Sequence, residues 1–428
     1  MPLHYLTAKL SLLPPLLQPT FDAIFSTLPL WCRWRLLVLQ SLNFLVPIVT
    51  APYWLFGNKY SVVYVPTRGG ARRRCLVFRP PCVSTGRGGE LGEGTERDVG
   101  GWWSEEEEGE LTAGDGSVEA RESYNTSKRA RGGNELRPLH IDIHGGSFIG
   151  GIPEQNARWC TLLSSRTGAI VISCTYRFAP RYTFPAAHDD VDDILAWIMQ
   201  HAEQIGGDRR LVTVGGSSAG GNLGLSAAVS WNSVGKRDRQ GSVEERGAES
   251  KRIDDEAEDW DGEEDAEGMD IKAYLSHYSA IDLRLPPQSK PRPANFPARD
   301  PLAFMFPLYD IYAGANRSEN LSNARLHPIL SEKKALPKDM LFIVAGIDIL
   351  VQEQLTFVER VRAEIERDGE EADRSVEARV FESGFHGWLE LPKMILEKER
   401  VAAFEASVDF IRRVHRKHGW YYQPKGMR

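Results

Sequence analysis

Short apolar runs alternate with longer stretches of helical periodicity along most of this chain. Apolar runs of four to eight residues are typical of buried strands, whereas apolar residues three or four positions apart are typical of helices that cover a sheet. The first pattern predicts strands at Ser61–Thr67, Cys75–Arg79, His140–Ile143, Ile170–Tyr176, Leu211–Val214, Ala273–Ser279, Met340–Val344 and Ala378–Phe381. The second predicts helices at Pro153–Thr167, Ala187–Ile205, Asn222–Trp231, Leu355–Asp368 and Lys398–His418. This alternation predicts an α/β protein with a mostly parallel sheet and helices on both faces.

Two polar segments, residues 86–135 and 236–270, interrupt this pattern. The first holds 12 of the 39 glycines, and residues 241–270 hold 14 acidic residues but only 3 basic ones. Such segments bury too little apolar surface to offset the conformational entropy lost on ordering. We therefore expect two disordered surface insertions within one domain that spans residues 61–428. A docking role for their acidic residues is the alternative.

A glycine-serine motif follows the predicted strand Leu211–Val214. Gly216-Ser217-Ser218-Ala219-Gly220 has the pattern G-x-S-x-G and leads into a predicted helix. The sharp turn of this motif strains the backbone of the middle serine, and a Cβ at either outer glycine would collide with the neighbouring strand and helix. The motif predicts that Ser218 is a nucleophile at the carboxyl end of the sheet. Ordinary glycine-rich turns can have the same sequence pattern. The assignment of a nucleophile therefore depends on whether the chain also supplies the other groups that a catalytic serine needs.

A serine nucleophile needs hydrogen-bond donors for the developing oxyanion. The predicted strand His140–Ile143 ends in His144-Gly145-Gly146, a loop that can direct backbone N–H groups at a carbonyl oxygen. We assign the oxyanion hole to the amides of Gly145, Gly146 and Ala219.

The serine also needs a base and an acid that orients the base. Asp348 follows the predicted strand Met340–Val344, and His386 follows the last predicted strand, in the chain order Ser, Asp, His. His386 would take the serine proton and Asp348 would fix the imidazole tautomer. Glu353 is the alternative acid.

Four separated blocks resemble the hormone-sensitive-lipase-like family of α/β-hydrolases, which includes arylacetamide-deacetylase-like carboxylesterases and fungal steryl-ester deacetylases. The likeness runs from about Ser61 to the C-terminus, and its blocks are His144-Gly145-Gly146, Tyr176-Arg177-Phe178-Ala179-Pro180 with Phe184-Pro185-Ala186-Ala187, Gly216 to Asn222, and Asp348 with His386. The resemblance implies the α/β-hydrolase fold with a helical cap, part of it an insertion near residues 284–335. The family has a third glycine where this chain has Ser147, and the residues after Asp348 also depart from its pattern.

Residues 1–60 are apolar and basic. Residues 1–80 contain nine Lys or Arg and one acid, and tryptophans and tyrosines flank the uncharged run Leu36–Asn58. Apolar surface, interfacial aromatics and basic residues together indicate contact with a membrane surface through residues 1–57, rather than a span. The resemblance implies that helices of this region also cap the acyl pocket. We expect a membrane-associated protein, compatible with the endoplasmic reticulum; a cytoplasmic protein is the alternative.

These observations predict a serine carboxylester hydrolase that acts on small lipophilic acyl esters through an acyl-enzyme. An amidase or arylformamidase with the same triad is one alternative. A non-catalytic ligand receptor on the same fold is another, although such receptors typically lose the histidine that this chain keeps as His386. No cofactor and no metal is expected, because His140 and His144 lie too far apart on a strand to share an ion. No basic-aromatic module for nucleic acid is present in the sequence.

Overall fold

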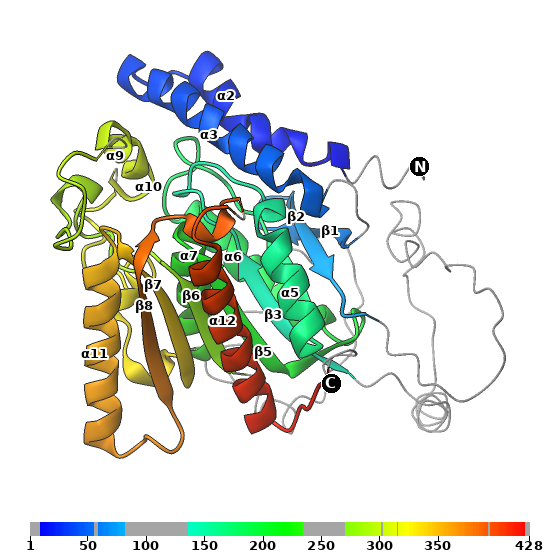
Figure 1. The fold of residues 1–428 in the computed structure, drawn as a ribbon. Coiled ribbons are helices and arrows are strands. Elements are labelled where there is room, and N and C mark those ends of the chain that lie inside the picture. Colours follow the sequence, from blue (N-terminus) through cyan, green and yellow to red (C-terminus); the bar gives the residue numbers. More distant parts are fainter. Residues whose placement is uncertain are drawn as a thin grey trace, which may run out of the picture.

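A computed structural model describes residues 9–54, 59–81, 136–233, 270–300, 303–314, 316–392 and 394–423. The two segments expected to be disordered, 86–135 and 236–270, lie outside the described residues except for Asp270. Figure 1 shows one layered body, with a central sheet, helices on both of its faces and two further helices across one end.

The central sheet has eight strands in the order β1-β2-β4-β3-β5-β6-β7-β8. The pairs β1–β2 and β2–β4 are antiparallel, and every other neighbouring pair is parallel. The strands are β1 Ser61–Thr67, β2 Ala71–Phe78, β3 Arg137–Ile143, β4 Ile170–Cys174, β5 Gly207–Ser217, β6 Ala273–His277, β7 Asp339–Ile347 and β8 Ser375–Phe385. This arrangement confirms the predicted mostly parallel α/β sheet.

Helices cover both faces because the buried strands are apolar on both sides. On β7, Leu341 and Ile343 pack in one core cluster with residues of the two helices at the front of Figure 1, whereas Phe342 packs on the opposite face. The front helices are α5 Ala157–Thr167 and α12 Glu397–Lys417, and the opposite face carries α6 Ala186–His201, α7 Ala219–Ser233 and α11 Val351–Asp368.

Two N-terminal helices, α2 Leu13–Phe25 and α3 Leu30–Trp54, pack against each other across one end of the sheet (Figure 1). One side of the pair is anchored to the body, since Cys32 and Leu36 are buried in the main core cluster. Asp22 is also buried, and it accepts a hydrogen bond from Arg181 at 2.6 Å. None of the helices in the described part of the chain is long and apolar enough to cross a membrane.

The segment expected to form a cap insertion, residues 284–335, consists of loops and short helices. It contacts the N-terminal pair at Phe304. The Trp34 ring stacks on the Phe304 ring with centroids 5.9 Å apart, and Arg35 donates a hydrogen bond to the Phe304 carbonyl. The short helices of this segment are η2 Pro287–Ser289, η3 Ala303–Met305, α9 Phe306–Tyr309, α10 Ile311–Gly314, η4 Pro328–Leu330 and η5 Lys333–Ala335.

Candidate active site

The turn between β5 and α7 holds Ser218 in a strained conformation. Its φ of 54° lies in the left-handed region, which residues with a side chain seldom adopt. Hydrogen bonds hold this geometry: the Ser218 amide donates to the His277 carbonyl at 2.9 Å, and the Ser218 carbonyl accepts from the amides of Gly221 and Ala280. The strain predicted from the motif is therefore present, and neighbouring elements over-determine it.

The two outer glycines of the motif are required by close packing of backbones. A Cβ placed on Gly220 would lie 2.0 Å from the Ile143 carbonyl oxygen at the end of β3. A Cβ on Gly216 would lie 2.7 Å from the same atom and 2.6 Å from the Gly220 carbonyl carbon. Atoms at these distances overlap, so α7 can begin directly behind the nucleophile only because both positions lack a side chain.

The structure brings Ser218, His386 and Asp348 together in one hydrogen-bonded chain. Ser218 Oγ lies 2.8 Å from His386 Nε2, and His386 Nδ1 lies 2.7 Å from Asp348 Oδ2. Asp348 follows β7, His386 follows β8, and the other oxygen of Asp348 accepts the Leu350 amide at 3.1 Å. These three side chains are the parts of a proton-transfer relay for nucleophilic attack: a buried acid, a ring that joins it to the serine, and a serine held in a strained turn.

The electrostatic surroundings favour the charged form of His386. Partial burial by itself lowers the pKa of the ring, but the Asp348 carboxylate, by charge and hydrogen bond, and the more distant charge of Glu390 outweigh it. The pKa of His386 is therefore raised above its ordinary value, even though 42% of the side chain is open to solvent. This environment stabilises the imidazolium that forms when the ring accepts the serine proton.

Glu353, the alternative acid, has a different set of partners. Its Oε1 accepts the amides of Ile281 at 2.8 Å and Asp282 at 3.2 Å, and its other oxygen pairs with Lys290. Burial raises the pKa of Glu353 to about 7, with Lys290 opposing the rise. These contacts tie α11 to the loop after β6, and they leave Asp348 as the carboxylate bonded to His386.

The loop His144-Gly145-Gly146 lies beside the nucleophile turn, but its amides are not equivalent. The Gly145 amide donates to Ser217 Oγ at 3.1 Å, so this predicted oxyanion donor is already used within the protein. No acceptor within the described part of the protein takes the amides of Gly146 or Ala219, the other two predicted donors. The same holds for Ser147, whose φ of 53° occupies the left-handed region that a glycine favours. The Ser147 amide is therefore a further candidate donor that the sequence reasoning missed, although the position of Ser147 at the family's third glycine was a signal for it.

His144 supports the loop from within the protein. Its Nδ1 lies 2.6 Å from the Gly145 carbonyl oxygen, its Nε2 lies 3.1 Å from Thr175 Oγ1, and its ring stacks on Tyr176. Complete burial lowers its pKa to about 4, so the ring is neutral near pH 7. Both ring nitrogens have partners within the protein, so the side chain acts as a neutral support for the loop.

A small cavity lies between the oxyanion loop and the cap segment. Its walls include Phe148, Leu283, Tyr309 and Tyr312, and its volume is about 20 Å³. The Phe148 ring stacks on Tyr312 at 4.2 Å, which joins the loop after Gly146 to α10. Tyr309 and Tyr312 of the cap segment therefore both line this cavity. Among the described residues, no group of three or more His, Cys, Asp or Glu side chains is arranged to hold a metal ion.

Comparisons with known proteins agree with this architecture. Over 81 residues the chain is 37% identical to an ethyl acetate hydrolase of Pseudomonas putida. The matched stretch covers 19% of this chain and 26% of the relative. Over 100 residues it is 36% identical to an arylesterase of Saccharolobus solfataricus. This stretch covers 23% of this chain and 31% of the relative. The chain thus spans less than a third of the length of these relatives.

Solved structures match over nearly the whole chain. A hyperthermophilic esterase from the archaeon Pyrobaculum calidifontis superposes with a TM-score of 0.56 at 20% identity and covers 89% of this chain and 93% of its own. A carboxyl esterase 2 from the fungus Tuber melanosporum gives 0.53 at 14% identity, with coverage of 84% and 87%. At such low identity these matches establish the fold alone. The family described as having the alpha/beta hydrolase fold matches residues 140–390, more than half of the sequence and all of the site, and the chain belongs to that family.

Proposed function

We propose that this protein is a serine carboxylester hydrolase of the hormone-sensitive-lipase-like family. The observation that carries the proposal is the chain from Ser218 Oγ through His386 to Asp348, with bonds of 2.8 and 2.7 Å, at the carboxyl ends of parallel strands. The motif blocks that resemble this family support the assignment, as do relatives named for ester hydrolysis.

The reaction that this geometry supports proceeds in two halves. His386 takes the proton of Ser218 while the serine oxygen attacks the ester carbonyl carbon, and the amides of Gly146 and Ala219 donate to the oxyanion. His386 then gives its proton to the departing alcohol, which leaves an acyl group on Ser218. A water molecule, deprotonated by His386, attacks this acyl-enzyme; the bond between the acyl carbon and Ser218 Oγ then breaks, His386 returns the proton to Ser218 Oγ, and the carboxylic acid is released.

Hydrolysis of p-nitrophenyl esters of increasing acyl length tests the proposal. Ser218→Ala should lower kcat by about 10⁴ or more, because the triad residues act as a unit. Ser226→Ala is a matched control, since this buried α7 serine makes no side-chain hydrogen bond in the described structure. A p-nitroanilide series run in parallel measures the competing amidase activity. Equal loss in both variants, or turnover of anilides only, would contradict the proposal.

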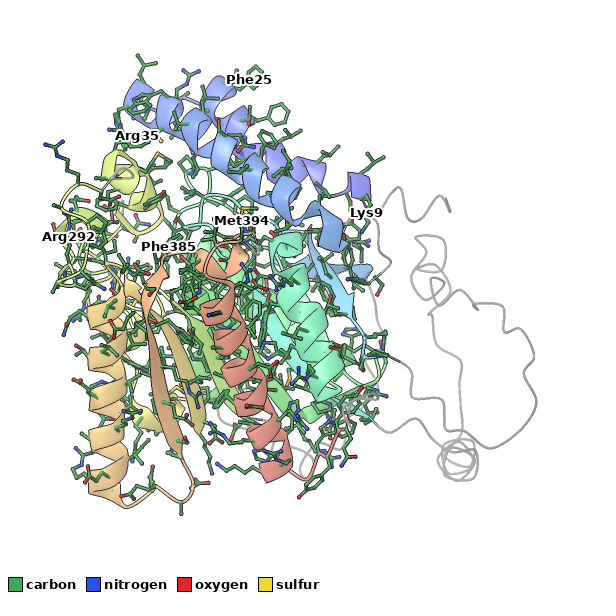
Figure 2. The ribbon with its side chains drawn as sticks, viewed as in Figure 1. Lys9, Phe25, Arg35, Arg292, Phe385 and Met394 are labelled. Carbon is green, nitrogen blue, oxygen red and sulfur yellow. The ribbon has the colours of Figure 1, made fainter. Side chains whose placement is uncertain are left out.

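We also propose that α2 and α3 rest on a membrane surface. The side of this pair that faces away from the body exposes large apolar side chains, with Phe25 76%, Leu30 78% and Ile48 68% exposed. Figure 2 shows Phe25 on the outer side of the helix pair. Several large apolar side chains exposed on one pair of helices are typical of an interaction site.

The segment that carries this face has a basic composition, which complements anionic lipid. Lys9, Arg33 and Arg35 belong to the same segment, whereas its one acid, Asp22, is buried against Arg181. Apolar insertion and attraction to anionic headgroups together give stable interfacial binding. Because α3 also contacts the cap segment at Phe304, a membrane bound to this helix pair would lie close to the cap segment.

Cosedimentation with vesicles tests this second proposal. The double variant Phe25→Ser/Leu30→Ser should lose most binding to vesicles that contain phosphatidylserine, while Tyr421→Ser, an equally exposed apolar position near the C-terminus, should bind as the unaltered protein does. Surface substitutions are preferable to truncation, since removal of α3 would uncover the core around Leu36. Absence of binding by the unaltered protein would refute the proposal.

A further inference from the structure

A second acidic side chain stands beside the candidate triad. Glu390 ends the short helix η6 Trp388–Glu390, which begins two residues after His386. Its Oε2 accepts a hydrogen bond of 2.5 Å from the hydroxyl of Tyr278. The Tyr278 ring in turn packs edge-on against the His386 ring, with centroids 5.2 Å apart. Tyr278 therefore touches the base with its ring and this second acid with its hydroxyl.

Tyr278 is held rigidly. It directly follows β6, its φ of 40° is left-handed, and its amide donates to the Ile343 carbonyl on β7. The ring is buried and also packs on Trp388 at 5.3 Å. A strained, fully packed aromatic residue offers a fixed surface to a neighbouring ring, and such strain concentrates at functional sites.

Glu390 also lies near a residue that supports the oxyanion loop. Ser217 Oγ accepts the amide of Gly145, and the Ser217 hydroxyl is close enough to the Glu390 carboxyl group to lower its pKa. Burial raises the pKa of Glu390, while the hydrogen bond from Tyr278, the nearby Ser217 hydroxyl and the charge of His386 oppose that rise. The Tyr278 hydroxyl donates to the ionised form of the carboxyl group and therefore limits how far burial raises the pKa.

The charged groups around His386 come from three elements. Asp348, after β7, bonds the ring directly, Glu390 on η6 adds a second negative charge, and Lys290 of the cap segment opposes both. Asp348, which is bonded to the ring, raises the pKa of His386 more than Glu390 does. Glu390 raises it too, through its charge alone.

We infer that Tyr278 and Glu390 form a positioning pair for His386, in which the ring fixes the imidazole and the carboxylate stabilises the imidazolium formed during attack. This inference rests on the proposed esterase function. The competing role is purely structural: the same hydrogen bond would only fasten the loop after His386 to β6.

The pH dependence of catalysis separates these roles. Glu390→Gln keeps the size of the side chain and removes its charge, so the imidazolium loses a stabilising partner and the acid limb of kcat/KM for p-nitrophenyl acetate should move to lower pH by on the order of half a unit. The kcat on the alkaline plateau should fall by about three- to tenfold. Tyr278→Phe, which keeps the ring and removes one donor to Glu390, should shift the limb in the same direction by less.

Glu382→Gln is the matched control, since this exposed glutamate of β8 lies four residues before His386 and its side chain makes no contact with it in the described structure. Its acid limb should stay in place. The inference is overturned if Glu390→Gln and Tyr278→Phe, both folded by thermal melting, keep the acid limb of the unaltered protein and lose only stability. If Glu390→Gln does not fold, the acid limb of Tyr278→Phe alone tests the inference.

Labelling of Ser218 by a fluorophosphonate, measured over the same pH range, keeps this result separate from the proposed function. This rate reports activation of the serine by His386 without reference to the ester. An unaltered protein that fails to label refutes the esterase proposal itself. An unaltered protein that labels, with an acid limb that Glu390→Gln does not move, refutes the positioning pair alone.

Discussion

At the scale of single residues, the protonation of His386 determines when the site can act. The ring must be neutral to accept the Ser218 proton, and its pKa lies above the ordinary 6.5 because the nearby carboxylates outweigh the effect of burial. Activity is therefore present above this raised pKa and is lost as the pH falls through it. We predict that the acid limb of kcat/KM has its midpoint above 6.5. A midpoint well below 6.5 would show that Asp348 does not support the ring.

The two acids near the end of β7 should respond differently to loss of charge. Asp348→Asn disturbs the imidazole tautomer and should lower kcat by about 10⁴. Glu353→Gln removes a charge from a buried pair with Lys290 and should lower the melting temperature while largely sparing kcat. The reverse result, a catalytic loss confined to Glu353→Gln, would reassign the triad acid.

Residues whose roles depend on chain order could be predicted from the sequence. Ser218, Asp348 and His386 each follow an apolar run, and parallel strands bring their carboxyl ends to one edge of a sheet. The engagement of Gly145 by Ser217, and the contact of Tyr278 with His386, could not be predicted. They depend on the conformations of loops with no sequence periodicity.

At the scale of elements, the turn between β5 and α7 depends on backbone contact. Gly220→Ala should destabilise the protein by at least about 3 kcal/mol, because its Cβ would overlap a carbonyl oxygen of Ile143 that is fixed in β3. Gly369→Ala is the control, since Gly369, unlike Gly220, has a positive φ and open space around it, so that its substitution introduces backbone strain without overlap and should cost about 1 kcal/mol. Equal costs in a denaturant titration would mean that the neighbouring backbone moves aside and that overlap does not require a glycine at position 220.

Apolar runs located all eight strands, but the ends of strands depend on pairing. β5 begins at Gly207, four residues before the predicted start, because its polar first residues still pair with β3 across an irregularity at Pro138. β8 is longer than predicted because it is an edge strand, and much of its outer surface is exposed and polar. A search for apolar runs detects neither the polar start of β5 nor the polar residues of β8.

At the scale of the whole molecule, the core is built from residues on either side of the two polar segments. β2 and β3 flank the first segment, and α7 and β6 flank the second, and all four elements supply buried core residues. Replacing residues 86–135 and 241–270 with short Gly-Ser linkers should therefore change the melting temperature by no more than about 3 °C, because loop length affects closure entropy only weakly. A larger fall would show that one segment contributes to the core.

The most direct test of the central claim is to map the residue that a fluorophosphonate probe modifies, by mass spectrometry of the labelled peptide. The account predicts a single adduct on Ser218 that disappears in Ser218→Ala and falls sharply in His386→Ala. Ser217→Ala should still be labelled, because this neighbouring hydroxyl bonds the Gly145 amide and makes no bond to His386 in the described structure. An adduct on Ser217, or labelling that survives in Ser218→Ala, would contradict the assignment of the nucleophile.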